Sequence, residues 1–210
     1  MSSILYITAN PNTKSKSYSL QLGEAFICAY EATHPMDRIQ RIDLYKQTPP
    51  TIDEDVLAAR EQLIQGDPFR DLNSVQQQKL FLLNQASDQF IQADKWVFVS
   101  PIWNWGVPPI MKQYIDAVMA PDRAYKIGPS GVEGLLKGKK AMIIQTSNVS
   151  GVFNQEGDDY SYLYLKSVLN KIGVQDVGDL LFDQFLSDQQ EMNVRFEEWI
   201  VEVERQAIGF

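Results

Sequence analysis

One stretch of the sequence decides the fold: Lys95-Trp96-Val97-Phe98-Val99-Ser100, followed by Pro101-Ile102-Trp103-Asn104-Trp105-Gly106-Val107-Pro108-Pro109. The first six residues predict a buried strand, because most of them are apolar, β-branched or aromatic. After the prolines, which suit the first turn of a helix, apolar residues recur at helical spacing from Ile110 to Met119. Two tryptophans and an asparagine therefore lie where a strand ends and a helix begins. In an open α/β sheet, ligands bind beyond the carboxyl ends of the strands.

The two tryptophans of this turn have two possible roles. Trp103 and Trp105 offer flat apolar walls, and the backbone N–H groups between them offer donors, which suits a flat ring system that forms hydrogen bonds. The alternative is that both side chains only pack the loop onto the domain. This stretch alone leaves both interpretations open.

A second polar loop follows the first predicted strand, which covers residues 4–9. The loop runs from Asn10 to Ser19 and is rich in turn formers and hydroxyl groups, and a helix is predicted from Ser19 to Ala32. A strand, a hydroxyl-rich loop and a helix N-terminus in this order predict an anion site, because backbone N–H groups and serine hydroxyls donate to a phosphate there. The alternative is that Ser17 or Ser19 is only the N-cap of the helix.

The rest of the chain alternates strands with helices. The patterns predict strands at 38–45, 141–146 and 174–182, helices at 53–65, 73–93, 159–172 and 187–207 with Ser187 as an N-cap, and a long Gly- and Pro-rich loop at 120–138. This order predicts an α/β fold, a flavodoxin-like doubly wound five-stranded parallel sheet in one domain spanning residues 1–210.

In such a sheet three polar loops converge at one edge: residues 10–19, 101–106 and 146–151. Together they predict an FMN site, with the first loop on the phosphate and the other two on the ring. No G-x-G-x-x-G follows the first strand and no G-x-x-x-x-G-K-[ST] occurs, which argues against a Rossmann dinucleotide domain or a P-loop enzyme.

Composition excludes several kinds of partner. The chain has 210 residues and a net charge of −8, which argues against nucleic acid and anionic membranes as partners. No secretory signal or membrane-spanning run is expected. The single cysteine, Cys28, cannot form an internal disulfide, and a cytoplasmic location is the simple inference. One cysteine and one histidine, His34, also argue against a metal site and a His-based triad, so any catalytic chemistry is expected to belong to an organic cofactor.

The chain resembles the FMN-dependent NADH azoreductases, a branch of the flavodoxin-like quinone reductases. The resemblance covers nearly the whole chain. It rests on three segments, Ser17-Tyr18-Ser19, Pro101-Ile102-Trp103-Asn104-Trp105 with the helix opening after it, and Gly134-Leu135-Leu136-Lys137-Gly138-Lys139-Lys140.

The resemblance implies which residues bind FMN. The phosphate is expected at Asn10, Ser17, Tyr18 and Ser19. The ring is expected at Pro101, Ile102, Trp103, Asn104 and Trp105, which replace the family's Pro-Met-Tyr-Asn-Phe. The family often has Ser-Arg-Gly-Gly after the fourth strand, and this chain departs from that pattern because it lacks the arginine and one glycine. Donors on the pyrimidine side of the ring are expected at Ser147, Asn148, Ser150 and Gly151.

The resemblance also implies an activity. NADH would deliver two electrons by a ping-pong mechanism to quinones and azo compounds, with N5 of the flavin carrying the chemistry and no catalytic side chain. Family members are homodimers with their sites at the subunit interface, so residues 45–93 and the loop with Tyr125, a candidate substrate-pocket residue, would wall the neighbouring site.

Two other interpretations stay open at this point. One is a flavodoxin-type carrier that exchanges single electrons with protein partners. The other is a flavin-free α/β domain whose serines are helix caps and whose tryptophans are core.

Overall fold

The computed structural model describes residues 1–129, 131–149, 160–183 and 188–210. The strands are β1 (Ser3–Thr8), β2 (Arg38–Asp43), β3 (Lys95–Pro101), β4 (Tyr125–Gly128), β5 (Gly131–Gly134), β6 (Lys140–Thr146) and β7 (Asp176–Phe182). The α-helices are α1 (Tyr18–Thr33), α2 (Glu54–Gln65), α3 (Ser74–Gln92), α4 (Pro109–Val118), α5 (Tyr160–Lys171) and α6 (Gln189–Ile208). Within the described residues, no helix is long and apolar enough to cross a membrane.

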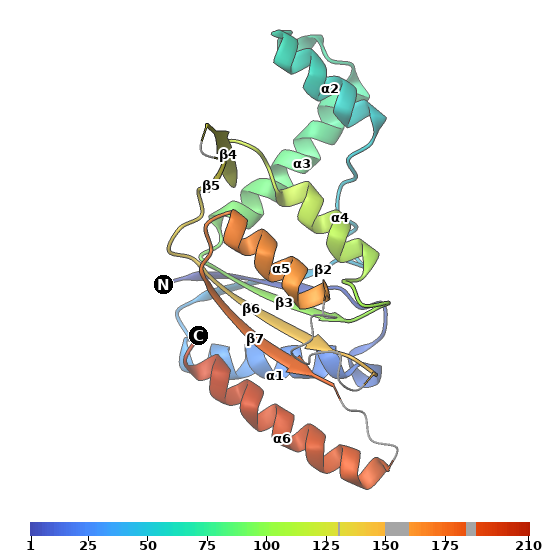
Figure 1. Cartoon of the computed structure of the whole chain (residues 1–210), viewed down its shortest axis with the longest axis vertical. Helices are drawn as coiled ribbons and strands as arrows, with labels where there is room; N and C mark the ends of the chain where they lie inside the picture. Colours follow the sequence, from blue (N-terminus) through green and yellow to red (C-terminus); the bar gives the residue numbers. More distant parts are fainter. Residues whose placement is uncertain (130, 150–159, 184–187) are drawn as a thin grey trace.

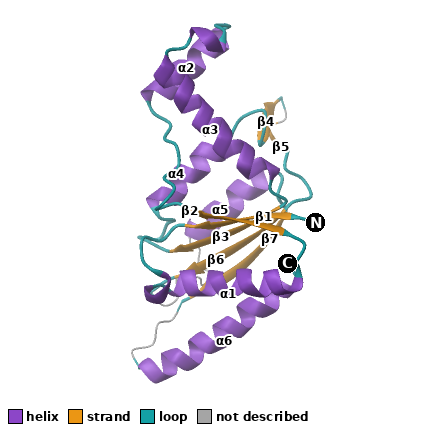
Figure 2. Ribbon diagram, turned by 180° about the vertical axis from the view of Figure 1, so that it is seen from behind, coloured by secondary structure: helices purple, strands orange, loops and turns teal. Residues whose placement is uncertain are grey.

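Five strands form one parallel sheet in the order β2-β1-β3-β6-β7. Helices α1 and α6 cover one face of this sheet, and α3, α4 and α5 cover the other (Figures 1 and 2). The predicted flavodoxin-like doubly wound sheet is therefore confirmed.

Strand β3 lies in the middle of the sheet and is buried on both faces. Trp96 and Phe98 pack against α3, α4 and α5, whereas Val97 and Val99 pack against α1 and α6. A strand with two buried faces has apolar residues at consecutive positions rather than at alternate ones. For this reason the apolar run before the Trp103–Trp105 turn identifies the centre of the sheet.

The 120–138 segment is not a plain loop, which corrects the sequence prediction. It contains an antiparallel hairpin in which β4 pairs with β5, and Lys126 forms an ion pair with Glu133 across it (3.1 Å). Each strand is only four residues long and ends in glycine, and within the described part of the chain the two strands form a sheet only with each other. Neither strand therefore has the apolar run by which sheet strands are recognised.

Helices α2 and α3 form an arm that projects from the sheet (Figure 1). Val56 and Ala59 are buried on α2, but two other apolar residues of this helix, Leu57 and Ile64, are exposed. They are exposed because α2 packs mainly on α3, and one neighbour buries only a narrow stripe of a helix. The arm thus presents apolar side chains to the outside.

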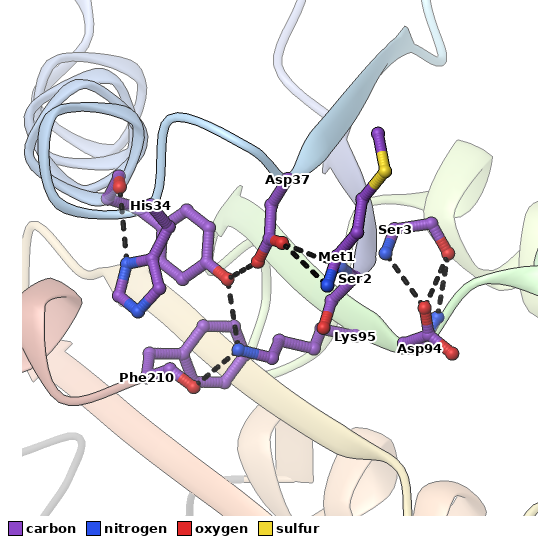
Figure 3. Close-up of polar contacts among 9 residues, drawn as sticks. Met1, Ser2, Ser3, His34, Asp37, Asp94, Lys95 and Phe210 are labelled. Carbon is purple, nitrogen blue, oxygen red and sulfur yellow. Dashed lines mark hydrogen bonds and ion pairs between the residues drawn. The ribbon is translucent and has the colours of Figure 1, made fainter.

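The termini meet in a polar cluster at the amino ends of the strands (Figure 3). The Nζ of Lys95 donates to the hydroxyl of Tyr30 (3.0 Å) and to the backbone oxygen of Phe210 (2.7 Å). The Tyr30 hydroxyl in turn donates to Asp37 (2.6 Å), which also accepts from the backbone N–H of Ser2 (2.6 Å). These bonds lower the pKa of the Asp37 carboxyl below its ordinary value.

Asp37→Asn should destabilise the protein by about 1–2 kcal/mol at pH 7, because it weakens charge-assisted hydrogen bonds. A carboxyl whose pKa is lowered by folding stabilises the folded state above its unfolded pKa, and this contribution is lost as the pH falls through the folded pKa. The difference in unfolding free energy between wild type and variant should therefore be full above about pH 5 and shrink below about pH 4. Urea titrations at several pH values measure it.

Asp67→Asn is the matched control, since Asp67 is exposed and its carboxylate has no hydrogen-bond partner among the described residues. It should leave the unfolding free energy unchanged. A wild-type advantage over Asp37→Asn that stays constant down to pH 3 would contradict the assignment.

Candidate functional site

Three loops leave the carboxyl ends of three adjacent strands, β1, β3 and β6. Backbone hydrogen bonds join them at their bases, from the N–H of Ala9 to the oxygen of Val99 (2.9 Å) and from the N–H of Ile102 to the oxygen of Thr146 (2.9 Å). The predicted convergence is confirmed for residues 10–19, 101–106 and 146–149. Ser150 and Gly151 lie outside the described residues.

The first loop carries a buried polar cluster. The amide Nδ2 of Asn10 donates to Ser17 Oγ (2.7 Å) and Ser19 Oγ (3.3 Å), and the two serine oxygens lie 3.1 Å apart. All three side chains are buried, with Ser19 only 1% exposed. This cluster lies at the first turn of α1, where backbone N–H groups lack intrahelical partners and the helix dipole favours an anion.

The N-cap alternative for these serines holds in part. Ser17 is the N-cap of α1, and its Oγ accepts from the backbone N–H of Leu20 (3.3 Å). Tyr18 therefore belongs to the first turn of the helix, one residue earlier than predicted. The cap does not explain why Asn10 and Ser19 are also polar and buried at this position.

The second loop is a tight turn from Trp103 to Gly106. The backbone N–H of each of these residues donates to the oxygen of the other, both at 3.0 Å. The two central residues, Asn104 (φ 48°) and Trp105 (φ 62°), lie in the left-handed region. Asparagine tolerates that region, but a bulky residue there is an outlier and stores strain. No described residue accepts from the backbone N–H of either central residue.

The tryptophans of this turn are not core residues. Trp103 is 39% exposed and Trp105 is 61% exposed. This exposure contradicts the flavin-free interpretation in which the tryptophans are core. Pro101 and Ile102, at the base of the turn, are half-buried.

The third loop is described as far as Val149. The hydroxyl of Ser147 donates to the backbone oxygen of Val149 (3.2 Å) and accepts from its N–H (3.1 Å), while the Ser147 N–H donates to the oxygen of Phe182 (2.9 Å). Ser147 is buried and Asn148 is exposed. The Ser147 hydroxyl is already engaged, so Asn148 is the better-placed side-chain donor in this part of the loop.

Tyr125 is not brought to these loops within one chain. It begins β4, and the paired strand β5 ends at Gly134, which packs against Gly173 just before β7. This hairpin lies at the amino ends of the strands, away from the three loops (Figure 1). A role for Tyr125 in the site of the same chain therefore has no support, and a role in a partner's site stays a prediction.

The donor set fits FMN. The first loop offers hydroxyls and a helix N-terminus for a phosphate. The Trp103–Gly106 turn offers exposed aromatic side chains and two backbone N–H groups that have no acceptor among residues 1–129, 131–149, 160–183 and 188–210. The first loop therefore suits a phosphate dianion, and the Trp103–Gly106 turn suits a flat ring that forms hydrogen bonds.

Sequence reasoning missed Gln145, which is buried beneath the second and third loops. Its signal was a lone amide at the end of the apolar run Ala141-Met142-Ile143-Ile144. The left-handed turn was also missed, since only the asparagine of Asn104-Trp105 favours that conformation.

The fold and the site define a class, a flavodoxin-like protein with an anion site after β1 and an aromatic turn after β3. Residues 2–205 match the family described as "Flavodoxin-like fold". The structure aligns with a crystal structure of azoreductase from Bacillus anthracis str. Sterne, with a TM-score of 0.89 and 24% identity over 100% of both chains. It also aligns with an FMN-dependent NADH-azoreductase from B. anthracis str. Ames Ancestor in complex with FMN, with a TM-score of 0.86 and 27% identity over 99% of this chain and 100% of the other.

Two curated relatives refine the class. The chain is 42% identical over 179 residues to FMN-dependent NADH:quinone oxidoreductase 2 of Bacillus cereus, covering 84% of each chain. It is 39% identical over 178 residues to FMN-dependent NADH:quinone oxidoreductase 2 of Bacillus subtilis, covering 83% of each. The chain belongs to the family of FMN-dependent NADH:quinone oxidoreductases, which confirms the resemblance inferred from its motifs.

Proposed function

We propose that this protein is an FMN-dependent oxidoreductase that takes two electrons from NADH and reduces quinones and azo compounds. The observation that carries the proposal is the Trp103–Gly106 turn, which lies beside the anion site of the first loop. It combines an exposed aromatic pair with two backbone N–H groups for which no described residue is an acceptor. The relatives named above support the cofactor, the donor and the quinone acceptor, and their azoreductase neighbours support the azo substrates.

Bound FMN would supply the two-electron chemistry, and the residues of the chain would bind and orient the cofactor. Asn10, Ser17 and Ser19, with the N-terminus of α1 at Tyr18, hold the phosphate. The backbone N–H groups of Asn104 and Trp105 would donate to the polar edge of the ring. Pro101, Ile102 and Trp103 would wall the ring. Asn148, Ser150 and Gly151 of the third loop would supply donors on its pyrimidine side, with Ser147 holding the base of that loop. No side-chain acid or base is assigned.

The mechanism is ping-pong, because donor and acceptor would use the same exposed face of the ring in turn. Initial rates of NADH oxidation at several quinone concentrations test this, and double-reciprocal plots should give parallel lines. Intersecting lines would contradict one shared face. If the protein bound FMN but did not oxidise NADH when a quinone or an azo dye was supplied, it would instead be the one-electron carrier. The comparisons do not favour that function.

Trp105→Gly should separate ring binding from folding. The left-handed backbone of residue 105 suits glycine, so the unfolding free energy should stay within about 1 kcal/mol of wild type. FMN affinity should fall about tenfold, because an aromatic contact with the ring is lost. Fluorescence titration with FMN and urea unfolding measure the two effects.

Asn104→Gly is the matched control for Trp105→Gly. It relaxes the same turn but keeps the tryptophan and both backbone N–H groups, so FMN affinity should be retained. Equal affinities for wild type and Trp105→Gly would contradict a ring contact at this residue.

The active assembly is a homodimer in the cytoplasm. Support for the dimer comes from the apolar side chains that the α2–α3 arm exposes and that a second copy would cover: Leu57, Ile64, Val75, Phe81 and Leu82. The arm and the hairpin with Tyr125 would then wall the partner's ring site, which is open in one chain. The exposed, unpaired thiol of Cys28 and the use of NADH agree with a reducing compartment.

A further inference from the structure

A buried polar network lies beneath the candidate ring site. The Nε2 of Gln145 in β6 donates to Ser100 Oγ in β3 (3.1 Å) and to Ser161 Oγ in α5 (2.6 Å). Gln145 and Ser161 are fully buried and Ser100 nearly so. The network occupies the layer between the sheet and α5, where Ile143 and Leu165 belong to the hydrophobic core.

This network costs folding free energy. The Oε1 of Gln145 is buried, and no residue in the described part of the chain donates a hydrogen bond to it. An unsatisfied buried carbonyl costs about 1–3 kcal/mol, whereas replacing all partners of a buried network by apolar groups is nearly neutral or stabilising. A residue that opposes stability in a well-packed layer is expected at a functional position.

The position of the network is specific. Ser100 and Gln145 are cross-strand partners, and the next pair, Pro101 and Thr146, is the last of the β3–β6 ladder. Both ring loops begin directly after that pair, with the Ile102 N–H donating to the Thr146 oxygen. The network thus joins the bases of the second and third loops to the first turn of α5.

We propose that Gln145 is a positioning residue for the flavin ring, an inference that rests on the proposed function. Through Ser100 and Ser161 it fixes the spacing of the 101–106 and 146–149 loops, and the ring contacts of both loops depend on that spacing. Gln145 lies beneath the loops and acts through them. The Gln145 amide weakens the fold, but it binds two hydroxyl groups on different elements at the same time, those of Ser100 and Ser161.

The triple variant Ser100→Ala/Gln145→Met/Ser161→Ala tests the proposal, since it removes the network without leaving an unpaired polar group or a large cavity. Its unfolding free energy should equal or exceed that of the wild type. Its Kd for FMN should rise about tenfold. The reduction potential of the bound FMN should shift by about 30 mV, the equivalent of a tenfold change in the ratio of affinities for the reduced and oxidised cofactor.

Two further variants keep the test decisive. Gln145→Met alone removes both hydrogen bonds with a side chain of similar length, and it should weaken FMN binding by a similar factor. Ser87→Ala is the control, because the Ser87 hydroxyl is buried and donates to the Val118 oxygen (3.0 Å) away from the loops. It should lower stability and leave both the FMN affinity and the potential unchanged.

The outcomes separate this inference from the proposed function. A wild type that binds FMN, with a triple variant that binds it equally and at the same potential, would overturn the positioning role alone. If the triple variant lost stability and FMN binding in parallel, the positioning role would also be overturned, since replacement of a merely structural residue gives that result. A wild type that does not bind FMN would overturn both proposals.

Discussion

Gly134→Ala should destabilise the protein by at least about 3 kcal/mol, the largest effect of a single methyl group that we expect in this chain. A Cβ at residue 134 would overlap backbone atoms of Ile172 and Gly173 and would come within 2.6 Å of Gly173 Cα, a separation that real Cβ atoms essentially never show. The obstacle is backbone rather than a flexible side chain, so no rotamer change relieves it.

The crossing at Gly134 is fixed from both sides. The backbone N–H of Leu136 donates to the oxygen of Ile172 (2.8 Å), and the N–H of Leu135 donates to the oxygen of Ala124 (3.0 Å). The first bond connects the end of the hairpin to the turn before β7, and the second joins the two ends of the hairpin. Moving β5 away to admit a methyl group would break the first of them. This explains why the Gly134–Lys140 motif begins with glycine.

Gly128→Ala is the matched control in the same hairpin, because among the described residues only the Gly131 oxygen lies within 4.0 Å of the added Cβ. Its unfolding free energy in urea should stay within about 0.5 kcal/mol of wild type. If Gly134→Ala matched that control, the close backbone crossing would be refuted.

Ser19→Ala should weaken FMN binding by about 10- to 100-fold, since a hydrogen bond to a charged group contributes about 1.5–3 kcal/mol. Ser19 is buried beside Asn10 and Ser17 at the start of α1 and is not the N-cap. Riboflavin, which has the ring but no phosphate, should bind wild type and variant equally. A parallel loss of riboflavin binding would show that the serine supports the loop as a whole.

Ser17→Ala separates the two roles of these serines. It removes the N-cap bond to the Leu20 N–H, so it should lower the unfolding free energy by about 1 kcal/mol as well as the FMN affinity. Ser19→Ala should leave the unfolding free energy nearly unchanged. Equal losses of stability in both variants would contradict the distinction.

The architecture was predictable because it depends on strong, local signals. Strands β1, β3 and β6 are buried on both faces and therefore appear as continuous apolar runs, and the alternation with helices implies parallel pairing. Adjacency of β1, β3 and β6 in the sheet then brings their loops together, whatever the detailed conformation of each. The fold and the location of the site follow from these facts.

The missed features depend on contacts between distant parts of the chain. The β4–β5 hairpin pairs only with itself, so its strands have no apolar run, and the exposure of Leu57 and Ile64 depends on what α2 packs against. The role of Gln145 becomes visible only when Ser100 and Ser161, from two other elements, are placed around it. Sequence patterns report burial and periodicity but not partners.

The most direct test of the central claim is an anaerobic titration of the FMN-loaded protein with NADH, followed by absorbance. We expect the protein to bind one FMN per chain, and one equivalent of NADH to remove the oxidised-flavin absorbance in a single two-electron step. Added quinone should then restore it. Failure of the protein to bind FMN, or a bound flavin that stays oxidised in excess NADH, would contradict the claim.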